Sequence, residues 1–184
     1  TKGQYSPTSR LGTHSPSTPL GSVERPVSAA ALALGAGAQF VARSVDTLQT
    51  HLPKILIRAH DHRGASFVEI FQNCIVYNDG VFSEFTDRDV AADRQLHLEH
   101  GKPMLFGAEK IKGIRVNTEK LEFEVVEIGA DGIGETDLLV HDETNRSLAT
   151  MLAAMEPPEF PTALGVLFCQ PAPTYEVAVD EQIN

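Results

Sequence analysis

"SAAALALGAGAQFVARSVDTLQTHLPKILIRAHDHRGASFVEIFQNC", residues 28–74, decides the fold of this chain. Ser28 can cap a short Ala/Leu helix, which one of two nearby glycines ends. "QFVARS" predicts a strand, and Asp46 can cap a second helix in which Pro53 interrupts the apolar pattern. "SFVEIFQ" predicts the next strand. This helix–strand–helix–strand order, with strands that are almost continuously apolar, predicts an α/β fold with a mostly parallel sheet.

The segments on both sides of this stretch differ from it in composition. Residues 1–27 are rich in Ser, Thr, Pro and Gly, which predicts a long irregular segment and, from composition alone, favours disorder. Residues 79–103 are mostly polar, and a helix is expected around 87–100. "EKIKGIRVNTEKLEFEVVEIG" alternates with period two and predicts a β-hairpin.

The end of the chain alternates between strand and helix signals. "DLLVHD" is a candidate strand, "NRSLATMLAAM" predicts a helix, and "MEPPEFP" breaks that helix. "GVLFCQPAPTYE" predicts a closing strand followed by a Pro-rich tail. The region after residue 78 is therefore expected to add a β-hairpin, a helix and a strand to the α/β unit.

Composition and charge exclude several classes of protein. The chain has 184 residues, of which 42% are hydrophobic and 22% charged, an ordinary globular composition. No apolar run is long enough to cross a membrane, and the polar N-terminus lacks the apolar region of a signal peptide, so we expect a cytoplasmic protein without a membrane partner. The net charge of −10 and the absence of a basic cluster argue against nucleic-acid binding.

The two cysteines, Cys74 and Cys169, are too few for a disulfide framework or a complete zinc site. A lone cysteine after a strand is most often a small buried hydrophobe. The alternative is that Cys74 is one ligand of a metal cluster whose other ligands lie elsewhere, because loops at strand ends are where ligands are usually placed. The residues alone leave both interpretations open.

Other motifs give weaker signals. "GAGAQF" lacks the third glycine of a dinucleotide fingerprint, and "HDH" and "HLEH" match no complete metal-ligand set, so solvated helix ends explain them. "TKGQYSPTS" combines a lysine, a glycine and several hydroxyls in an irregular segment. Such a segment can wrap an anionic ligand, since backbone N–H groups and a lysine suit phosphate or carboxylate.

Four stretches together resemble a known family. "TKGQYSPTS", "ALALGAGAQFVAR", "SFVEIFQNCIVYNDG" and "GVLFCQPAPTYE" are similar, in the same order, to the β subunit of 2-oxoacid:ferredoxin oxidoreductases, most of all those that act on 2-oxoglutarate. The resemblance covers essentially the whole chain. It implies a thiamine-diphosphate-binding fold, of which residues 1–78 are the C-terminal part and residues 79–184 a C-terminal extension rich in β-hairpin.

The resemblance also implies the cofactors and the residues that bind them. The family's β subunit binds thiamine diphosphate, Mg²⁺ and one [4Fe–4S] cluster; Cys74 matches the fourth cysteine ligand of that cluster, and Cys169 matches no ligand. Lys2 falls where the family places a lysine near the thiamine and the 2-oxoacid, so it is the candidate catalytic residue, holding the substrate carboxylate. Thr1 and Gln4 belong to the same cofactor-proximal motif.

The implied enzyme oxidatively decarboxylates a 2-oxoacid to its acyl-CoA, using coenzyme A as acceptor, and passes electrons through the cluster to ferredoxin. The family's Mg²⁺-binding motif and three other cysteines lie upstream of the stretches matched here. We therefore expect the chain to be a processed or truncated piece, with the α subunit and the N-terminal part of the β subunit as partners. The alternative is a non-catalytic interaction domain, a remnant half-subunit that binds a partner chain.

Overall fold

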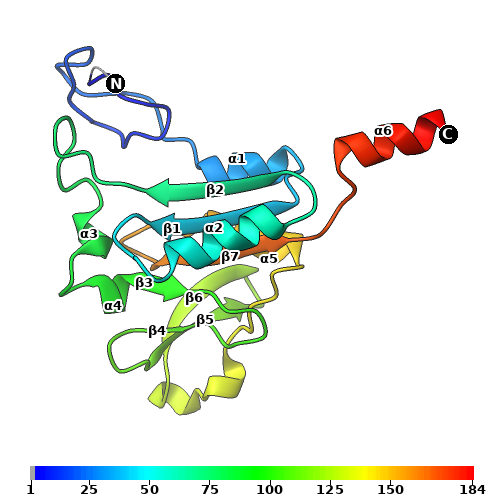
Figure 1. Ribbon diagram of the computed structural model, residues 1–184. Helices are drawn as coiled ribbons and strands as arrows, with labels where there is room; N and C mark the ends of the chain where they lie inside the picture. The colour runs from blue at the N-terminus through cyan, green and yellow to red at the C-terminus, as the bar shows by residue number, and fades with distance from the viewer. Residues whose placement is uncertain (1–2) are drawn as a thin grey trace.

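A four-stranded sheet forms the centre of the computed structural model, which describes residues 3–184 (Figure 1). The strand order is β2-β1-β7-β3. The pairings of β1 with β2 and of β3 with β7 are parallel, whereas β1 and β7 are antiparallel. The predicted α/β class is confirmed, with a mixed sheet. The strands are β1 (Phe40–Val45), β2 (Ser66–Phe71), β3 (Gln95–His97) and β7 (Thr162–Cys169).

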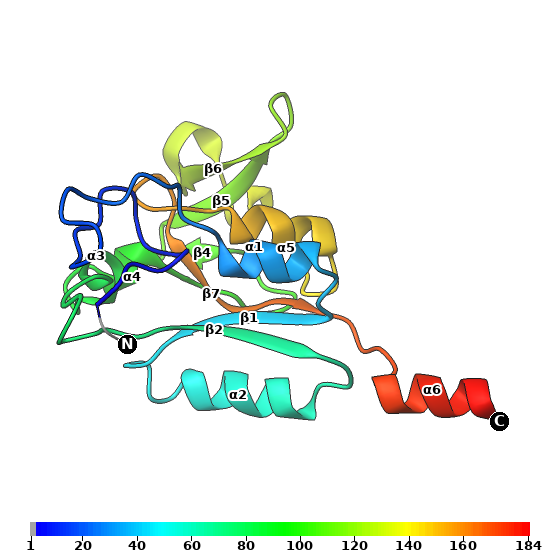
Figure 2. The same ribbon diagram turned by 90° about the horizontal axis from the view of Figure 1, so that it is seen from above.

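Helices cover both faces of this sheet (Figure 2). Helices α1 (Ala29–Gly35) and α5 (Arg146–Ala153) lie on one face, and α2 (Leu52–Asp61) lies on the other. Ser28 caps α1 by accepting a hydrogen bond from the Ala31 backbone N–H, as predicted, and Asn145 caps α5 in the same way. The result is a three-layer α/β/α arrangement.

Three sequence predictions about local structure were wrong. Helix α2 begins at Leu52 rather than at Asp46, because Pro53 lies in its first turn, where a missing N–H costs nothing. The helix expected around 87–100 is a single turn, α4 (Ala91–Arg94), and the chain then enters β3, which buries Leu96 completely. "DLLVHD" forms no strand and contributes only an isolated bridge between Pro103 and Val140.

A second, antiparallel sheet contains the predicted hairpin. Its strands are β4 (Leu105–Phe106), β5 (Lys112–Asn117) and β6 (Glu122–Glu127), followed by the short turns η1 (Ala130–Gly132) and η2 (Glu135–Asp137). Strands β3 and β7 also come from beyond residue 78, yet they lie in the same sheet as β1 and β2. The division into a domain and an extension at that residue stays a prediction.

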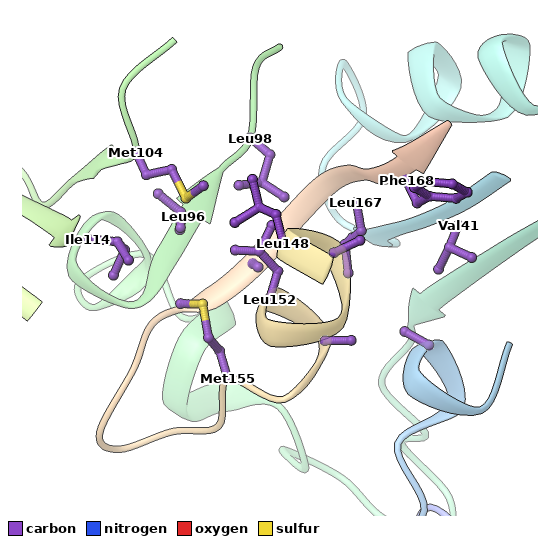
Figure 3. Packing of buried hydrophobic residues seen from close by; sticks show 14 of the residues in the cluster. Val41, Leu96, Leu98, Met104, Ile114, Leu148, Leu152, Met155, Leu167 and Phe168 are labelled. Carbon is purple, nitrogen blue, oxygen red and sulfur yellow. The ribbon is translucent and has the colours of Figure 1, made fainter. Parts of the chain in front are cut away.

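One hydrophobic cluster joins the two sheets (Figure 3). Leu148 and Leu152 of α5 lie in the middle of it, with Leu167 of β7 on the central sheet and Ile114 of β5 on the second. Ile114, Leu152 and Leu167 are completely buried. Burying a side chain of this size contributes about 1.5–3 kcal/mol, so the cluster holds the second sheet against the first.

The two ends of the chain differ in secondary structure. Residues 3–27 contain no helix or strand, as predicted, but backbone hydrogen bonds such as Gly12 N–H to Ser22 O (2.8 Å) and Val27 N–H to Pro7 O (2.8 Å) fold them into a loop. After the Pro-rich tail comes α6 (Tyr175–Ile183), a helix that the sequence analysis missed and that projects away from the body (Figure 1).

No helix within residues 3–184 has the length and apolar character needed to cross a membrane.

A substitution at Gly165 in β7 tests how closely the central sheet is packed. Its φ is +123°, and a Cβ there would lie 2.9 Å from the backbone oxygen of Leu98. We expect Gly165→Ala to lower the free energy of unfolding by roughly 2–4 kcal/mol, because backbone strain and overpacking add. Urea unfolding measures it. Gly35→Ala is the control: no atom lies within 4 Å of its Cβ, so it should be neutral or stabilise by up to about 1 kcal/mol. Equal destabilisation by both changes would contradict the prediction.

Candidate functional site

The site is built at the edge of the sheet where β1 and β2 end together. Val45 and Phe71, the last residues of the two parallel strands, are paired in register. Ligands of α/β proteins commonly bind beyond the carboxyl ends of such strands. A crevice of about 500 Å³ lies at this edge and is lined by residues from both strand ends, including Asp46, Phe71 and Asn73.

The loop that follows β2, residues 73–80, is here called the cysteine loop. The side-chain amide of Asn73 joins the two ends of the loop through two hydrogen bonds. Its Nδ2 donates to Asp79 Oδ1 (2.8 Å), and its Oδ1 accepts from the Gly80 backbone N–H (2.9 Å). Within the loop, the Asn78 N–H donates to the Cys74 carbonyl oxygen (2.9 Å). The sequence analysis missed Asn73, although an asparagine before the cysteine and an Asp-Gly at the end of the loop are the signals of such a closure.

Cys74 presents its thiol at the surface of this loop. The residue is exposed, so it is not the buried hydrophobe that a lone cysteine most often is. Backbone N–H groups of Tyr77 and Val76 hold the pKa of the Cys74 thiol below its ordinary value. Because these N–H groups favour the thiolate, the form that binds metals, the loop is chemically suited to supply a metal ligand.

Cys169 has a different environment. It is half-buried at the end of β7 and packs against the cluster formed by Phe40, Ala42, Ile55 and Val166. Burial, together with the neighbouring Glu143 carboxylate, raises the pKa of the Cys169 thiol. Its Sγ lies 3.8 Å from Nδ1 of His62. The prediction of a packed thiol agrees with this position.

The structure brings the end of the "TKGQ" motif against the cysteine loop. Gly3 has φ +78°, and a Cβ at this residue would lie only 2.8 Å from Cδ1 of Tyr77. The N-terminal loop and the loop after β2 lie at the same end of the molecule in both views (Figures 1 and 2). Gln4, next along the motif, is exposed. The sequence analysis did not anticipate this contact between segments far apart in the chain.

Two of the predicted site residues, Thr1 and Lys2, lie outside the described residues. Their predicted roles, like that of Gln4, therefore stay predictions. Within residues 3–184, no three His, Cys, Asp or Glu side chains converge as a metal site would require. Cys74 thus offers one thiolate, which fits a single ligand position of a [4Fe–4S] cluster, and the remaining ligands of such a cluster would come from other parts of the protein.

Comparison with known proteins identifies relatives along the whole chain. No family model matches it. The chain is 36% identical over all 184 residues to 2-oxoglutarate oxidoreductase subunit KorB of Mycobacterium tuberculosis, of which it covers 48%. It is 40% identical over 85 residues, 46% of the chain, to the β subunit of 2-oxoacid:ferredoxin oxidoreductase 1 of Aeropyrum pernix, of which it covers 27%. The chain therefore spans at most about half the length of these relatives.

A solved structure shows the same fold. A 2-oxoglutarate:ferredoxin oxidoreductase from Magnetococcus marinus, with 2-oxoglutarate, coenzyme A and succinyl-CoA bound, superimposes with a TM-score of 0.65 at 23% identity. The match covers 98% of this chain and 46% of the other. This structure shows the fold, and the sequence relatives confirm the resemblance to β subunits of 2-oxoacid:ferredoxin oxidoreductases.

The pKa of the Cys74 thiol should lie below the ordinary value for cysteine, and that of the Cys169 thiol above it. We expect the rate of alkylation by iodoacetamide to reach half its plateau at a lower pH for Cys74 than for Cys169, because only the thiolate reacts. Peptide mass spectrometry after timed labelling measures both residues in one sample. In urea the two midpoints should converge near about 8.5. Identical midpoints in the folded chain, or a lower one for Cys169, would contradict the described environments.

Proposed function

We propose that this chain, which is similar over its whole length to β subunits of 2-oxoacid:ferredoxin oxidoreductases, is part of such an enzyme. The enzyme would oxidatively decarboxylate a 2-oxoacid, with 2-oxoglutarate as the first candidate, to its acyl-CoA and pass electrons through a [4Fe–4S] cluster to ferredoxin. The observation that carries the proposal is the exposed Cys74 thiol, surrounded by backbone N–H groups in a loop closed by Asn73.

Each residue of the candidate site has a role in this proposal. Thiamine diphosphate with Mg²⁺ would supply the decarboxylation chemistry and the cluster the one-electron steps, while the protein supplies position and electrostatics. Cys74 would bind one iron of the cluster. Lys2 would hold the substrate carboxylate, with Thr1 and Gln4 beside it on the thiamine side. The three-layer α/β/α arrangement supports a thiamine-diphosphate-binding fold.

Partner chains complete the proposed site. One thiolate cannot hold a cluster, and the relatives are about twice as long as this chain. We infer that the rest of the β subunit and an α subunit supply the other ligands and the remaining half of the thiamine site. The tip of the cysteine loop supports this inference, because Ile75 and Val76 are 77% and 73% exposed and would be covered in an assembly.

A non-catalytic interaction domain is the second candidate. The projecting helix α6 favours it, since Tyr175 and Ile183 are 81% and 76% exposed and a nine-residue helix has little stability without a partner. Bound cofactor separates the two candidates. Iron and thiamine diphosphate in the purified assembly support the enzyme, and a colourless assembly that retains its partner chain supports the interaction domain.

Matched substitutions of the two cysteines test the proposed cluster. Cys74→Ser should remove most of the iron from the assembly, because a serine oxygen is a harder and poorer ligand for cluster iron than a thiolate. Cys169→Ser makes the same chemical change at a packed position and should leave the iron in place. Iron content and the visible absorption of the cluster report the difference. Equal iron in both variants would remove Cys74 from the cluster.

Lys2→Ala tests the proposed substrate contact. We expect the catalytic efficiency with 2-oxoglutarate to fall about 10- to 150-fold, because a charge-assisted contact to a carboxylate contributes roughly 1.5–3 kcal/mol. The iron content should not change, since the proposed contact is to the substrate. Steady-state kinetics of ferredoxin reduction, run beside an iron assay, measures both. Unchanged efficiency would exclude Lys2 from the site.

A further inference from the structure

Tyr77 connects the two segments of the candidate site. Its ring lies against Gly3, where a Cβ would meet Cδ1 at 2.8 Å and Cε1 at 3.1 Å, with Pro16 behind at 3.5 Å. Gly3 also has φ +78°, a conformation that side-chain-bearing residues rarely adopt. Both the close contact and the backbone conformation therefore favour glycine at position 3, and the backbone of Gly3 rests directly on the aromatic ring.

The same tyrosine is part of the structure that holds the Cys74 thiol. The Tyr77 backbone N–H points at the thiol, the Asn78 N–H bonds the Cys74 carbonyl, and Asn73 closes the loop below them. Ring and thiol therefore belong to one hydrogen-bonded loop. A displacement of the Tyr77 backbone would therefore disturb the hydrogen bonds around the Cys74 thiol.

An ion pair also connects the N-terminal loop to the segment that follows the cysteine loop, but it restrains their relative position only weakly. Arg10 forms a two-pronged ion pair with Glu84 of α3 (Ser83–Thr86), but both side chains are more than a third exposed. Exposed ion pairs contribute little to a fixed geometry, because water and salt screen them. The contact between the Tyr77 ring, which is 55% exposed, and Gly3 adds a steric restraint that screening by water and salt does not weaken.

We propose that Tyr77 is a positioning residue that fixes the Cys74 loop against Gly3 in the N-terminal loop. Its consequence for catalysis rests on the proposed function: the contact sets the separation between the substrate-binding segment and the thiolate that would bind the cluster. The contact itself does not depend on that function. The ring provides the bulk, and no hydrogen bond of its hydroxyl to another residue enters the argument.

Hydrogen exchange of the assembly tests the positioning without any cofactor chemistry. Gly3→Ala should push the ring and speed amide exchange in residues 74–80 by about tenfold or more, because the bonded N–H groups of Asn78 and Gly80 become exposed. Gly12→Ala is the matched control: its φ is +82°, but no atom lies within 4 Å of its Cβ. Tyr77→Ala should also speed exchange in the loop, because it removes the ring that holds the loop against Gly3. Tyr77→Phe should behave as the unchanged chain.

Two results would overturn the positioning role. One is unchanged exchange of the loop in Gly3→Ala, and the other is equal acceleration in Gly12→Ala. A separate measurement tests the functional consequence. In the loaded assembly, Gly3→Ala should slow ferredoxin reduction more than release of carbon dioxide, and the control Gly12→Ala should leave the ratio of the two rates unchanged. If the unchanged assembly holds no iron while the exchange pattern appears as expected, the proposed function fails and the positioning contact stands.

Discussion

A buried ion pair between Arg43 of β1 and Glu69 of β2 is the interaction on which the arrangement depends. The two residues are paired in register, Arg43 Nε lies 2.7 Å from Glu69 Oε2, and Arg43 is only 6% exposed. The guanidinium also donates to the Ser28 hydroxyl and to the Ala153 carbonyl, both at 3.4 Å. Removing one partner of such a pair would leave an uncompensated charge in the interior, which is strongly unfavourable. This one ties the strand register to the start of α1 and the end of α5.

The register then determines what happens at the edge of the sheet. Because side chains alternate along a strand, a slip of one residue would move every side chain of β2 to the opposite face. With Phe71 held beside Val45, the Cys74 loop leaves the sheet at the carboxyl ends of both strands. The N-terminal loop reaches the same edge, and Gly3 rests there on Tyr77. The candidate site therefore depends on a pairing several residues away from it.

The sequence predicted those parts of the structure whose cause is local. Capping by Ser28, the apolar strands β1 and β2 and the alternating hairpin each follow from neighbouring residues. The antiparallel insertion of β7 between β1 and β3 depends on contacts between distant segments, which no local pattern records. The same holds for the site. Cys74 was predicted as a ligand from its position after a strand and from a family resemblance, and that role stays a prediction, whereas the contact of Gly3 with Tyr77 exists only in the folded chain.

The chemistry of the cysteine loop also indicates what surroundings it requires. The pKa of Cys74 is lowered first by backbone N–H groups, and residues 73–80 contain no lysine or arginine, so the loop favours a thiolate without adding a cationic side chain of its own. Ile75, Val76 and Tyr77 then place apolar surface beside that thiolate. A charged group among exposed apolar side chains is a poor arrangement in water but a suitable one at a covered interface, where N–H groups replace the lost solvent. This arrangement agrees with the proposed function, in which another part of the assembly would cover the loop.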